Sequence, residues 1–443
     1  MERRSLPPGP ATTPVGAMLA LRRDPIGLLT LAASFGDVSH VRLPRTSLYV
    51  LNHPELASDV LAAHHSRFNK GPTMEAARRV LGESLLTSEG ELHRQRRRML
   101  QPIFHHERIA SYAADMVELG IRATRTWSDG QRIDVHAEMA RLTLEIVGRT
   151  LFGVDIGTDR ARQIGAALNE TLSQFDRVLS PFLTVTERLP LPANRRFQRA
   201  RKTFDDAVYG MIRQRRAARL QGSDVLSLLL REGDNLSDED VRDEALTLFL
   251  AGHETTSSAL TWTWYLLSED PAARSGLRAE LADVLGERLP TYADVGALPY
   301  TDAVLREAMR LFPPAWAIGR RVVSEHVAGP YTIPSGAVVV VSPWLMHRDP
   351  RWWEDPNAFR PERWLGEAPS VRGAFLPFGA GPRMCIGADF AHIEAVLLIA
   401  TIARRWRFSR DPSTDVGLRP VITLRPRGGM PMTAHADSQV VAR

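Results

Sequence analysis

The sequence predicts a mainly α-helical protein with small β-sheets. The chain has 443 residues, of which 44% are hydrophobic and 24% charged, a balance typical of a folded protein with a large buried core. From about residue 91 to residue 230, and again in a long stretch that ends before Pro271, apolar side chains return every three or four positions, as on one face of a helix. Strand-like apolar runs are confined to short segments near residues 37–54 and 331–344.

The elements are expected in a simple order. Two short strands, "DVSHVRL" and "SLYVLNHP", form a small sheet after a Pro-rich start, and helices follow in "MARLTLEIVGRTLFG" and "RFQRARKTFDDAVYGMIRQRRAARL". The longest helix begins after Ser237, a good N-cap with Asp240 three residues later, and ends just before Pro271. Because it is apolar nearly all round, we expect it in the middle of the protein. More strands follow in "YTIPSGAVVVVSPW", and a last helix begins near Gly387.

We expect one domain, residues 1–433, followed by a flexible C-terminal tail, residues 434–443, because no Gly/Ser-rich tether, charge block or repeat marks a junction. A single cysteine cannot form an internal disulfide, so the cytoplasm is the expected location. The first apolar stretch, residues 15–21, is short, Pro-flanked and closed by arginines, which fits neither a signal peptide nor a membrane anchor. The net charge of +5 is too diffuse to indicate nucleic-acid binding but is compatible with an acidic partner protein.

The only cysteine, Cys385, lies in the glycine-rich segment "FGAGPRMCIG", residues 378–387. The glycines let backbone amides approach the sulfur, Arg383 adds positive charge, and the following helix adds the positive end of its dipole, all of which favour a thiolate ligand. The alternatives are a buried cysteine acting as a small hydrophobe, a nucleophile with His392 as its base, and a zinc ligand. His392 is seven residues away and no Cys/His cluster completes a zinc site. A single thiolate suits haem iron, because the porphyrin supplies four ligands itself.

The long helix carries a polar interruption, "AGHETT", residues 251–256, which is costly in an apolar core. Leu248, Ala251, Thr255 and Ala259 share one face with small side chains at its middle, where a flat ligand could lie. The Thr255 hydroxyl can donate to the Ala251 carbonyl, and Gly252 is expected to ease a local distortion of the helix.

The other polar residues of this segment have simpler explanations. His253 is expected to be structural, and Thr256 is a weaker candidate than Thr255. A purely structural alternative for Glu254 is a buried carboxylate paired with an arginine.

The cysteine segment resembles the haem-binding signature of the cytochrome P-450 family in every fixed position, which here are Phe378, Gly381, Arg383, Cys385 and Gly387. The resemblance implies the P-450 fold, a helix-rich triangular domain with small β-sheets and haem between the long central helix and the helix after the cysteine loop. It also implies haem b (iron protoporphyrin IX) with Cys385 as axial ligand, Phe378 near the sulfur and Arg383 at a haem propionate.

The same resemblance assigns catalytic roles to Cys385, Glu254 and Thr255. Glu254 would be the acid linked to bulk water, and Thr255 the alcohol that directs protons during oxygen activation. The cofactor-binding residues that it implies are His93, Arg97, Ala251, Arg320, Phe378, Arg383, Cys385 and Gly387. Arg321 is the alternative to Arg320, and many members of the family carry tryptophan in place of His93.

Other motifs imply supporting roles. "EAMR" and "FRPERW" resemble the segments whose Glu307, Arg310 and Arg363 form a buried structural network. Three further arginines on the helix of His93 and Arg97 are expected on its other faces: Arg94, Arg96 and Arg98. They form either a solvated surface or a docking site for an acidic ferredoxin. The candidates for substrate contacts are apolar or small: Leu248, Ala251, Trp316, Ile318, Val421 and Ile422.

We therefore expect a haem-thiolate monooxygenase that uses dioxygen to hydroxylate or otherwise oxidise a lipophilic molecule, such as a terpene, polyketide, steroid or fatty acid, in secondary metabolism such as antibiotic or terpene biosynthesis. No flavin or nicotinamide motif is visible, so electrons are expected from separate proteins, which the resemblance implies to be a ferredoxin and a ferredoxin reductase. The alternatives are a peroxygenase driven by hydrogen peroxide and, from another class, a non-catalytic haem gas sensor or carrier.

Overall fold

The computed structural model describes residues 6–173, 191–217, 224–231, 236–366, 371 and 373–437. The chain forms two compact units, each built from separate stretches of sequence. Unit 1 contains Met1–Ala77, Arg310–Ala358 and Gly366–Cys385, and unit 2 contains Arg78–Met309, Phe359–Leu365 and Ile386–Arg443. The prediction of one domain over residues 1–433 stays a prediction.

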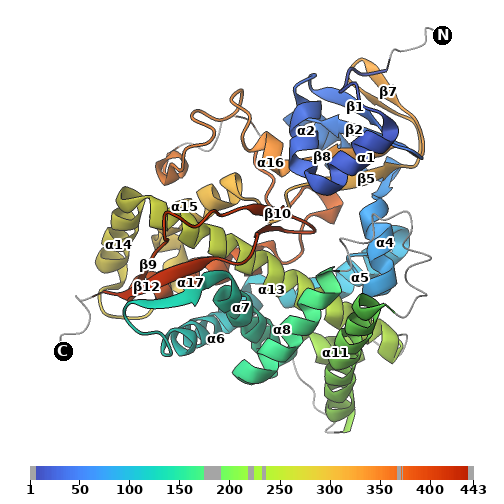
Figure 1. Cartoon of the computed structure of the whole chain (residues 1–443). Coiled ribbons are helices and arrows are strands. Elements are labelled where there is room, and N and C mark those ends of the chain that lie inside the picture. The colour runs from blue at the N-terminus through green and yellow to red at the C-terminus, as the bar shows by residue number, and fades with distance from the viewer. Residues whose placement is uncertain are drawn as a thin grey trace. The chain divides into compact units, whose positions relative to one another are not determined.

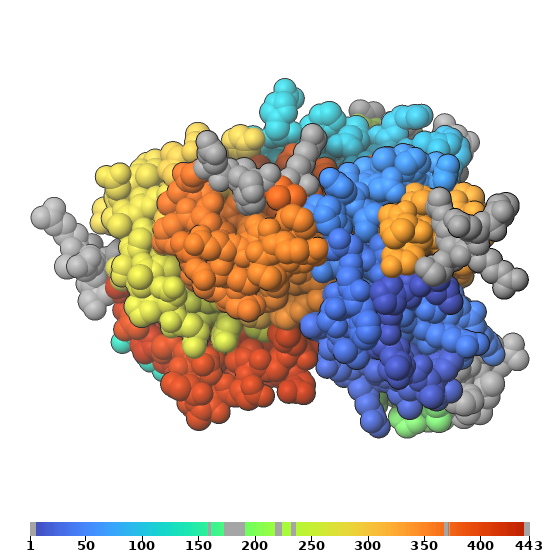
Figure 2. All heavy atoms as spheres, turned by 90° about the horizontal axis from the view of Figure 1, so that it is seen from above, coloured from blue at the N-terminus to red at the C-terminus, as the bar shows by residue number. Residues whose placement is uncertain are grey.

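Unit 1 is organised around a five-stranded sheet in the order β1-β2-β8-β5-β3. Its strands are β1 Val38–Arg42, β2 Ser47–Leu51, β3 Phe68–Lys70, β5 Ile318–Val322 and β8 Val338–Val341. The β2 and β8 strands are parallel, with Val50 opposite Val340, and the other neighbours are antiparallel. The predicted sheet of "DVSHVRL" and "SLYVLNHP" is confirmed, as is the strand in "AVVVV". Figures 1 and 2 show the N-terminal residues of this unit, in blue, beside the light orange segment that follows β5.

Short helices and one hairpin complete unit 1. They are α1 Pro14–Arg23, α2 Pro25–Ala33, α3 Pro54–Ser58, η1 Asp59–Ala63, η2 His65–Arg67, α16 Pro343–Met346, η7 Gly381–Arg383 and the hairpin β6 His326–Ala328 with β7 Tyr331–Ile333. Four of these helices begin with proline, whose missing N–H has no partner to lose in a first turn. Two further helices, α4 Pro72–Leu81 and α15 Pro299–Leu311, cross from one unit to the other along the chain.

Unit 2 is mostly helical. Its helices are α5 Gly90–Leu100, η3 Gln101–Phe104, α6 His106–Thr124, α7 Val135–Phe152, α8 Gly157–Ser173, α11 Pro192–Ala217, α12 Val225–Arg231, α13 Asp238–Glu269, α14 Pro271–Leu285, η5 Tyr292–Ala297, η6 Pro361–Trp364 and α17 Ala388–Ala403. The predicted long helix is α13, which starts at a capping box of Ser237 and Asp240 and packs against α7, α11, α17 and β9 (Figure 1). It is buried along most of its length, as its apolar pattern predicted.

Unit 2 also contains a three-stranded sheet and a hairpin. The sheet has the order β4-β12-β9, from Gln131–Asp134, Pro431–Ala436 and Trp406–Ser409, and the hairpin joins β10 Leu418–Pro420 to β11 Leu424–Pro426. The predicted C-terminal tail therefore starts too early, because residues 434–436 pair in β12. Small and polar residues alternate there, which gives a weak strand signal. Residues 438–443 of that tail lie outside the described residues.

In the part of the chain that the structure describes, none of the helices combines the length and the apolar character that crossing a membrane requires.

Candidate functional site

Backbone hydrogen bonds close the cysteine loop of unit 1. The Cys385 amide donates to the Phe378 carbonyl at 3.0 Å, and the Met384 amide donates to the Gly381 carbonyl at 2.9 Å, so the loop closes on itself. Cys385 is exposed, which argues against the alternative of a buried cysteine that only fills space. A cysteine exposed on a loop that its own backbone hydrogen bonds close is a suitable single ligand for a haem iron.

Gly381 is required where the cysteine loop packs on its neighbours. Its φ of 72° lies in the left-handed region, and a Cβ at this position would lie 2.1 Å from the Leu61 carbonyl oxygen of η1. Gly379 also has a positive φ, and a Cβ there would lie 3.7 Å from the Ile318 side chain. Ile318, a candidate for substrate contact, therefore lies beside the backbone of the cysteine loop.

The remaining candidates of unit 1 lie on or near β5. One guanidinium nitrogen of Arg320 donates to the Gly319 carbonyl at 2.9 Å. Arg321, the alternative to Arg320, instead forms an ion pair with Glu75 at 2.7 Å. Trp316 is buried, and its carbonyl accepts from the Ser342 hydroxyl at 2.8 Å, which ties this segment to the end of β8.

Arg310 is a fully buried cation of unit 1. Its guanidinium donates to the carbonyls of His347 at 2.8 Å, Pro356 at 2.6 Å and Ala358 at 2.9 Å, and it lies 5.1 Å from the centre of the Trp353 ring. The Arg310 guanidinium therefore holds three backbone carbonyls in place, which fits the structural role that its motif implies.

In unit 2, Glu307 and Arg363 meet. The Arg363 Nε donates to the buried Glu307 carboxylate at 2.9 Å. Sequence reasoning missed two further donors to this carboxylate, the Trp364 indole at 2.9 Å and the Arg360 amide at 3.0 Å. They lie in the same "FRPERW" segment, so this short segment supplies three donors to one buried carboxylate.

The central part of α13 differs from expectation at Gly252. The Thr255 hydroxyl donates to the Ala251 carbonyl at 2.7 Å, as predicted. However, α13 is a continuous α-helix, so the predicted distortion is absent from it. A Cβ at Gly252 would lie 2.8 Å from Val147 of α7, so this glycine instead allows two helices to pack closely. Leu248 is buried on the same helix.

His253 has the structural role that we expected. It is buried, its Nδ1 lies 2.6 Å from the Phe249 carbonyl, and burial lowers the pKa of its imidazole to about 4. The Thr143 hydroxyl of α7 donates to the His253 carbonyl at 2.9 Å. The neutral imidazole is therefore bonded within its own helix, and the His253 backbone carbonyl joins α13 to α7.

Glu254 is buried, with 2% of the residue exposed, and its partners come from the β10–β11 hairpin. The Thr423 hydroxyl donates to the Glu254 carboxylate at 2.6 Å, and Arg425 forms an ion pair with it. Burial raises the pKa of the carboxyl, while the Arg425 charge and the Thr423 hydrogen bond oppose that rise. Sequence reasoning missed both partners, although they alternate with apolar residues in "PVITLRP". The candidates Val421 and Ile422 are half-buried at the same turn.

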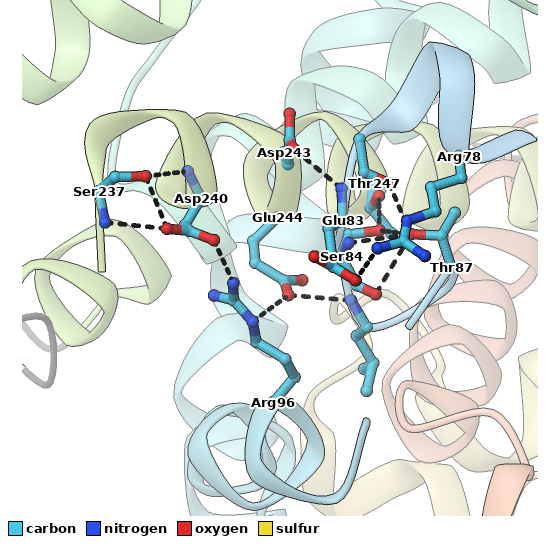
Figure 3. Close-up of polar contacts among 12 residues, drawn as sticks. Arg78, Glu83, Ser84, Thr87, Arg96, Ser237, Asp240, Asp243, Glu244 and Thr247 are labelled. Atoms are coloured by element: carbon cyan, nitrogen blue, oxygen red, sulfur yellow. Dashed lines mark hydrogen bonds and ion pairs between the residues drawn. The ribbon is translucent and has the colours of Figure 1, made fainter. Parts of the chain in front are cut away.

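The helix α5 corrects one expectation. His93 is buried, and Arg94 pairs with Glu91. Arg96 does not point to solvent: it is buried against the start of α13, where it pairs with Asp240 and, at 3.5 Å, with Glu244 (Figure 3). Several acidic side chains lie in the first turns of α13. Their attraction for the Arg96 guanidinium outweighs the cost of removing it from water.

Acidic side chains at the start of α13 also bind the segment between α4 and α5. The amides of Glu83 and Leu85 donate to the carboxylates of Asp243 and Glu244, both at 2.9 Å, and the Thr247 hydroxyl donates to Ser84 at 2.7 Å (Figure 3). The first turns of α13 therefore fix this segment through side chains that the sequence patterns did not single out.

Glu394 of α17 is a further buried carboxyl that sequence reasoning missed. It is completely buried, and burial raises the pKa of its carboxyl well above the ordinary value. The Thr256 hydroxyl of α13 favours its ionised form but does not offset burial. Glu394 lies nine residues after Cys385 in an otherwise apolar helix, and this apolar sequence context could have indicated a buried carboxyl.

Comparison with known proteins identifies the family of the chain. A family model described as cytochrome P-450 matches residues 7–428. Three similar proteins come from Streptomyces. Cyclooctatin synthase of Streptomyces melanosporofaciens is 39% identical over 92% of this chain and 91% of its own, and cyclooctat-9-en-7-ol 5-monooxygenase of the same species is 39% identical over 92% and 90%. Pentalenene oxygenase of Streptomyces avermitilis is 34% identical over 93% of both chains.

The helix-rich fold and the cysteine loop are those of a haem-thiolate protein. The chain belongs to the cytochrome P-450 family. It is an oxidoreductase, a monooxygenase that acts on a lipophilic substrate and dioxygen.

Proposed function

We propose that this enzyme binds haem b through Cys385 and hydroxylates a terpene, with electrons from a ferredoxin and its reductase. The observation that carries the proposal is the identity of 34–39%, over more than nine tenths of the chain, to three proteins whose names denote cyclooctatin, cyclooctat-9-en-7-ol and pentalenene. The single cysteine, which cannot form an internal disulfide, supports the cytoplasm as the place where these partners meet.

The residues present fit the cofactor. Cys385 is exposed on a loop in which Gly381 leaves no room for a side chain of its own. The Cys385 thiolate is therefore available as the single protein ligand. When bound, the haem supplies the reductive activation of dioxygen from which one oxygen atom enters the substrate. The remaining proposed roles follow the family. Arginines and a histidine bind the propionates, Phe378 packs near the sulfur, and small residues lie along the ring; these are His93, Arg97, Arg320 and Arg383, with Ala251 and Gly387.

The protein's own part in the chemistry is to orient the substrate and to supply protons. Glu254 takes up protons and Thr255 directs them, since a positioned carboxyl and hydroxyl are good proton-transfer groups. The proposed substrate contacts are mostly apolar and suit a hydrocarbon skeleton: Leu248, Ala251, Trp316, Ile318, Val421 and Ile422.

The ligand assignment is tested by Cys385→Ala, with Met384→Ala, an exposed neighbour in the same loop, as the matched control. The control is expected to give the absorption band that marks thiolate ligation in the ferrous carbon monoxide complex, and Cys385→Ala is expected to lose it. Survival of that band in Cys385→Ala would refute the assignment.

The reaction is tested by supplying the holoenzyme with a panel of terpene hydrocarbons and alcohols and a reduced ferredoxin, and by searching for hydroxylated products. We expect product with ferredoxin and dioxygen. Turnover with hydrogen peroxide but not with ferredoxin would favour a peroxygenase, and the absence of any product would contradict the proposed substrate class.

A further inference from the structure

The partners of Glu254 connect a buried carboxylate to the surface of unit 2. Thr423 and Arg425, which contact Glu254, also line a cavity of about 300 Å³. The other described lining residues come from α7, α8 and the segment around the hairpin: His136, Asn169, Arg419, Val421, Ile422, Pro426, Gly428 and Gly429. Asn169 and Arg419 are exposed, so the cavity opens to solvent. It has room and polar groups for several water molecules.

Hydrogen bonds link this opening to the carboxylate, and Arg425 donates in both directions. Arg425 donates to the Asn169 side chain at 3.1 Å and to the Thr423 hydroxyl at 3.3 Å, and Thr423 donates to Glu254 at 2.6 Å. Figure 1 shows the helices involved, α7, α8 and α13, side by side within unit 2. Arg425 itself is only partly buried, with 14% of its side chain exposed, whereas Glu254 is enclosed.

Arg425 is the cation that contacts this carboxylate directly. The other charged or titratable groups around Glu254 are Arg419 of the hairpin, His136 of α7 and His253 of α13 itself. Burial lowers the pKa of both imidazoles to about 4, so they are neutral at neutral pH. A proton that leaves Glu254 therefore leaves a buried negative charge whose direct partner is Arg425.

We propose that Arg425 is a positioning residue for the monooxygenase reaction: with Thr423, it holds Glu254 behind the wall of a cavity that is open to solvent and stabilises the carboxylate each time it gives up a proton. Hydroxylation of one substrate molecule consumes one dioxygen, two electrons and two protons and releases one water, so protons must enter from solvent in every turnover. The cavity behind the hairpin supplies them, Glu254 passes them on, and Arg425 compensates the charge left behind.

This inference rests on the proposed role of Glu254, and it predicts more than a structural ion pair would. Removing one partner of a buried pair leaves an uncompensated charge. Without Arg425, ionised Glu254 is costly, so its carboxyl stays neutral and gives up its proton slowly. A merely structural pair would change the stability of the hairpin without changing the rate of proton delivery.

The first test measures ionisation and needs no turnover. Infrared difference spectra between the wild-type holoprotein and Glu254→Gln assign the carbonyl stretch of the neutral Glu254 carboxyl, and a pH titration follows that band. In Arg425→Gln the neutral band is expected to persist to higher pH than in the wild type, and Arg425→Lys, which keeps the charge, is expected to restore the wild-type titration. An unchanged titration in Arg425→Gln would overturn the inference.

The second test measures the use of electrons. In Arg425→Gln the product formed per electron is expected to fall roughly tenfold, with peroxide released and a larger solvent deuterium isotope effect. Arg427→Gln is the matched control, because Arg427 belongs to the same hairpin but has 69% of its side chain exposed. It is expected to behave as the wild type.

A second variant separates function from folding. Thr423→Val keeps the volume of the side chain but removes the hydroxyl that joins Arg425 to Glu254, and it is expected to lower coupling in the same direction. If Arg425→Gln or Thr423→Val folds, binds haem and retains both wild-type coupling and the wild-type isotope effect, the inference fails while the proposed function stands. If the wild type forms no product, the proposed function fails, and the infrared titration still decides whether Arg425 controls the charge of Glu254.

Discussion

The buried carboxyl of Glu394 is expected to make stability depend on pH. Its pKa is raised in the folded protein, whereas in the unfolded chain it lies near the ordinary value of about 4.3. As pH rises above that value, the unfolded chain releases its proton and the folded protein does not. The folded protein therefore loses stability as pH rises towards the raised pKa.

Glu394→Gln removes this loss because glutamine cannot ionise. We expect the variant to be more stable than the wild type at pH 7 and equal to it near pH 4. Thermal unfolding of the holoprotein at both pH values measures the difference. Glu107→Gln, at an exposed position of α6, should shift neither value. A Glu394→Gln protein that unfolds at a lower temperature than the wild type at pH 7 would show that the carboxyl is needed in its ionised form.

At the scale of elements, α5 is joined to α13 by a buried ion pair. Arg96 has 5% of its side chain exposed, and its partner Glu244 has none. Arg96→Leu would leave Glu244 buried without its cation, and breaking such a pair from one side costs about 3–5 kcal/mol. The melting temperature of the Arg96→Leu holoprotein is therefore expected to fall by several degrees.

Two further variants identify the cause. Arg98→Leu, an exposed change on the same helix, is expected to leave the melting temperature within about a degree of the wild type. In the double variant Arg96→Leu, Glu244→Leu the unpaired charge is gone, so part of the lost stability should return. Equal melting temperatures of Arg96→Leu and Arg98→Leu would mean that the pair does not stabilise the α5–α13 contact.

For the whole molecule, the sequence predicted the features that are local in the chain. The capping box at Ser237 and the apolar pattern of α13 lie within one continuous stretch of chain, so both could be recognised from the sequence. The pairs Glu254–Arg425 and Arg96–Asp240 join residues far apart in sequence, and only the fold brings them together. The role of Gly252 was likewise misjudged, because the Val147 side chain that requires it belongs to another helix.

The net charge of the chain leads to a prediction about the electron donor. The chain carries a formal charge of +5, so an acidic ferredoxin should be attracted before it makes contact, and electrostatic steering of this kind raises association rates by about tenfold or more. Salt screens such attraction, because the Debye length shrinks to about 8 Å at 0.15 M and about 3 Å at 1 M. The rate of reduction by ferredoxin is therefore expected to fall steadily as salt is added.

Stopped-flow reduction under carbon monoxide measures this rate, because formation of the ferrous complex can be followed by its absorption. An uncharged small-molecule reductant is the control, and its rate should stay constant over the same range of salt, which excludes a general effect of salt on the haem site. A ferredoxin rate that does not change, or that rises with salt, would mean that the positive charge plays no part in the encounter and that apolar contacts govern it instead.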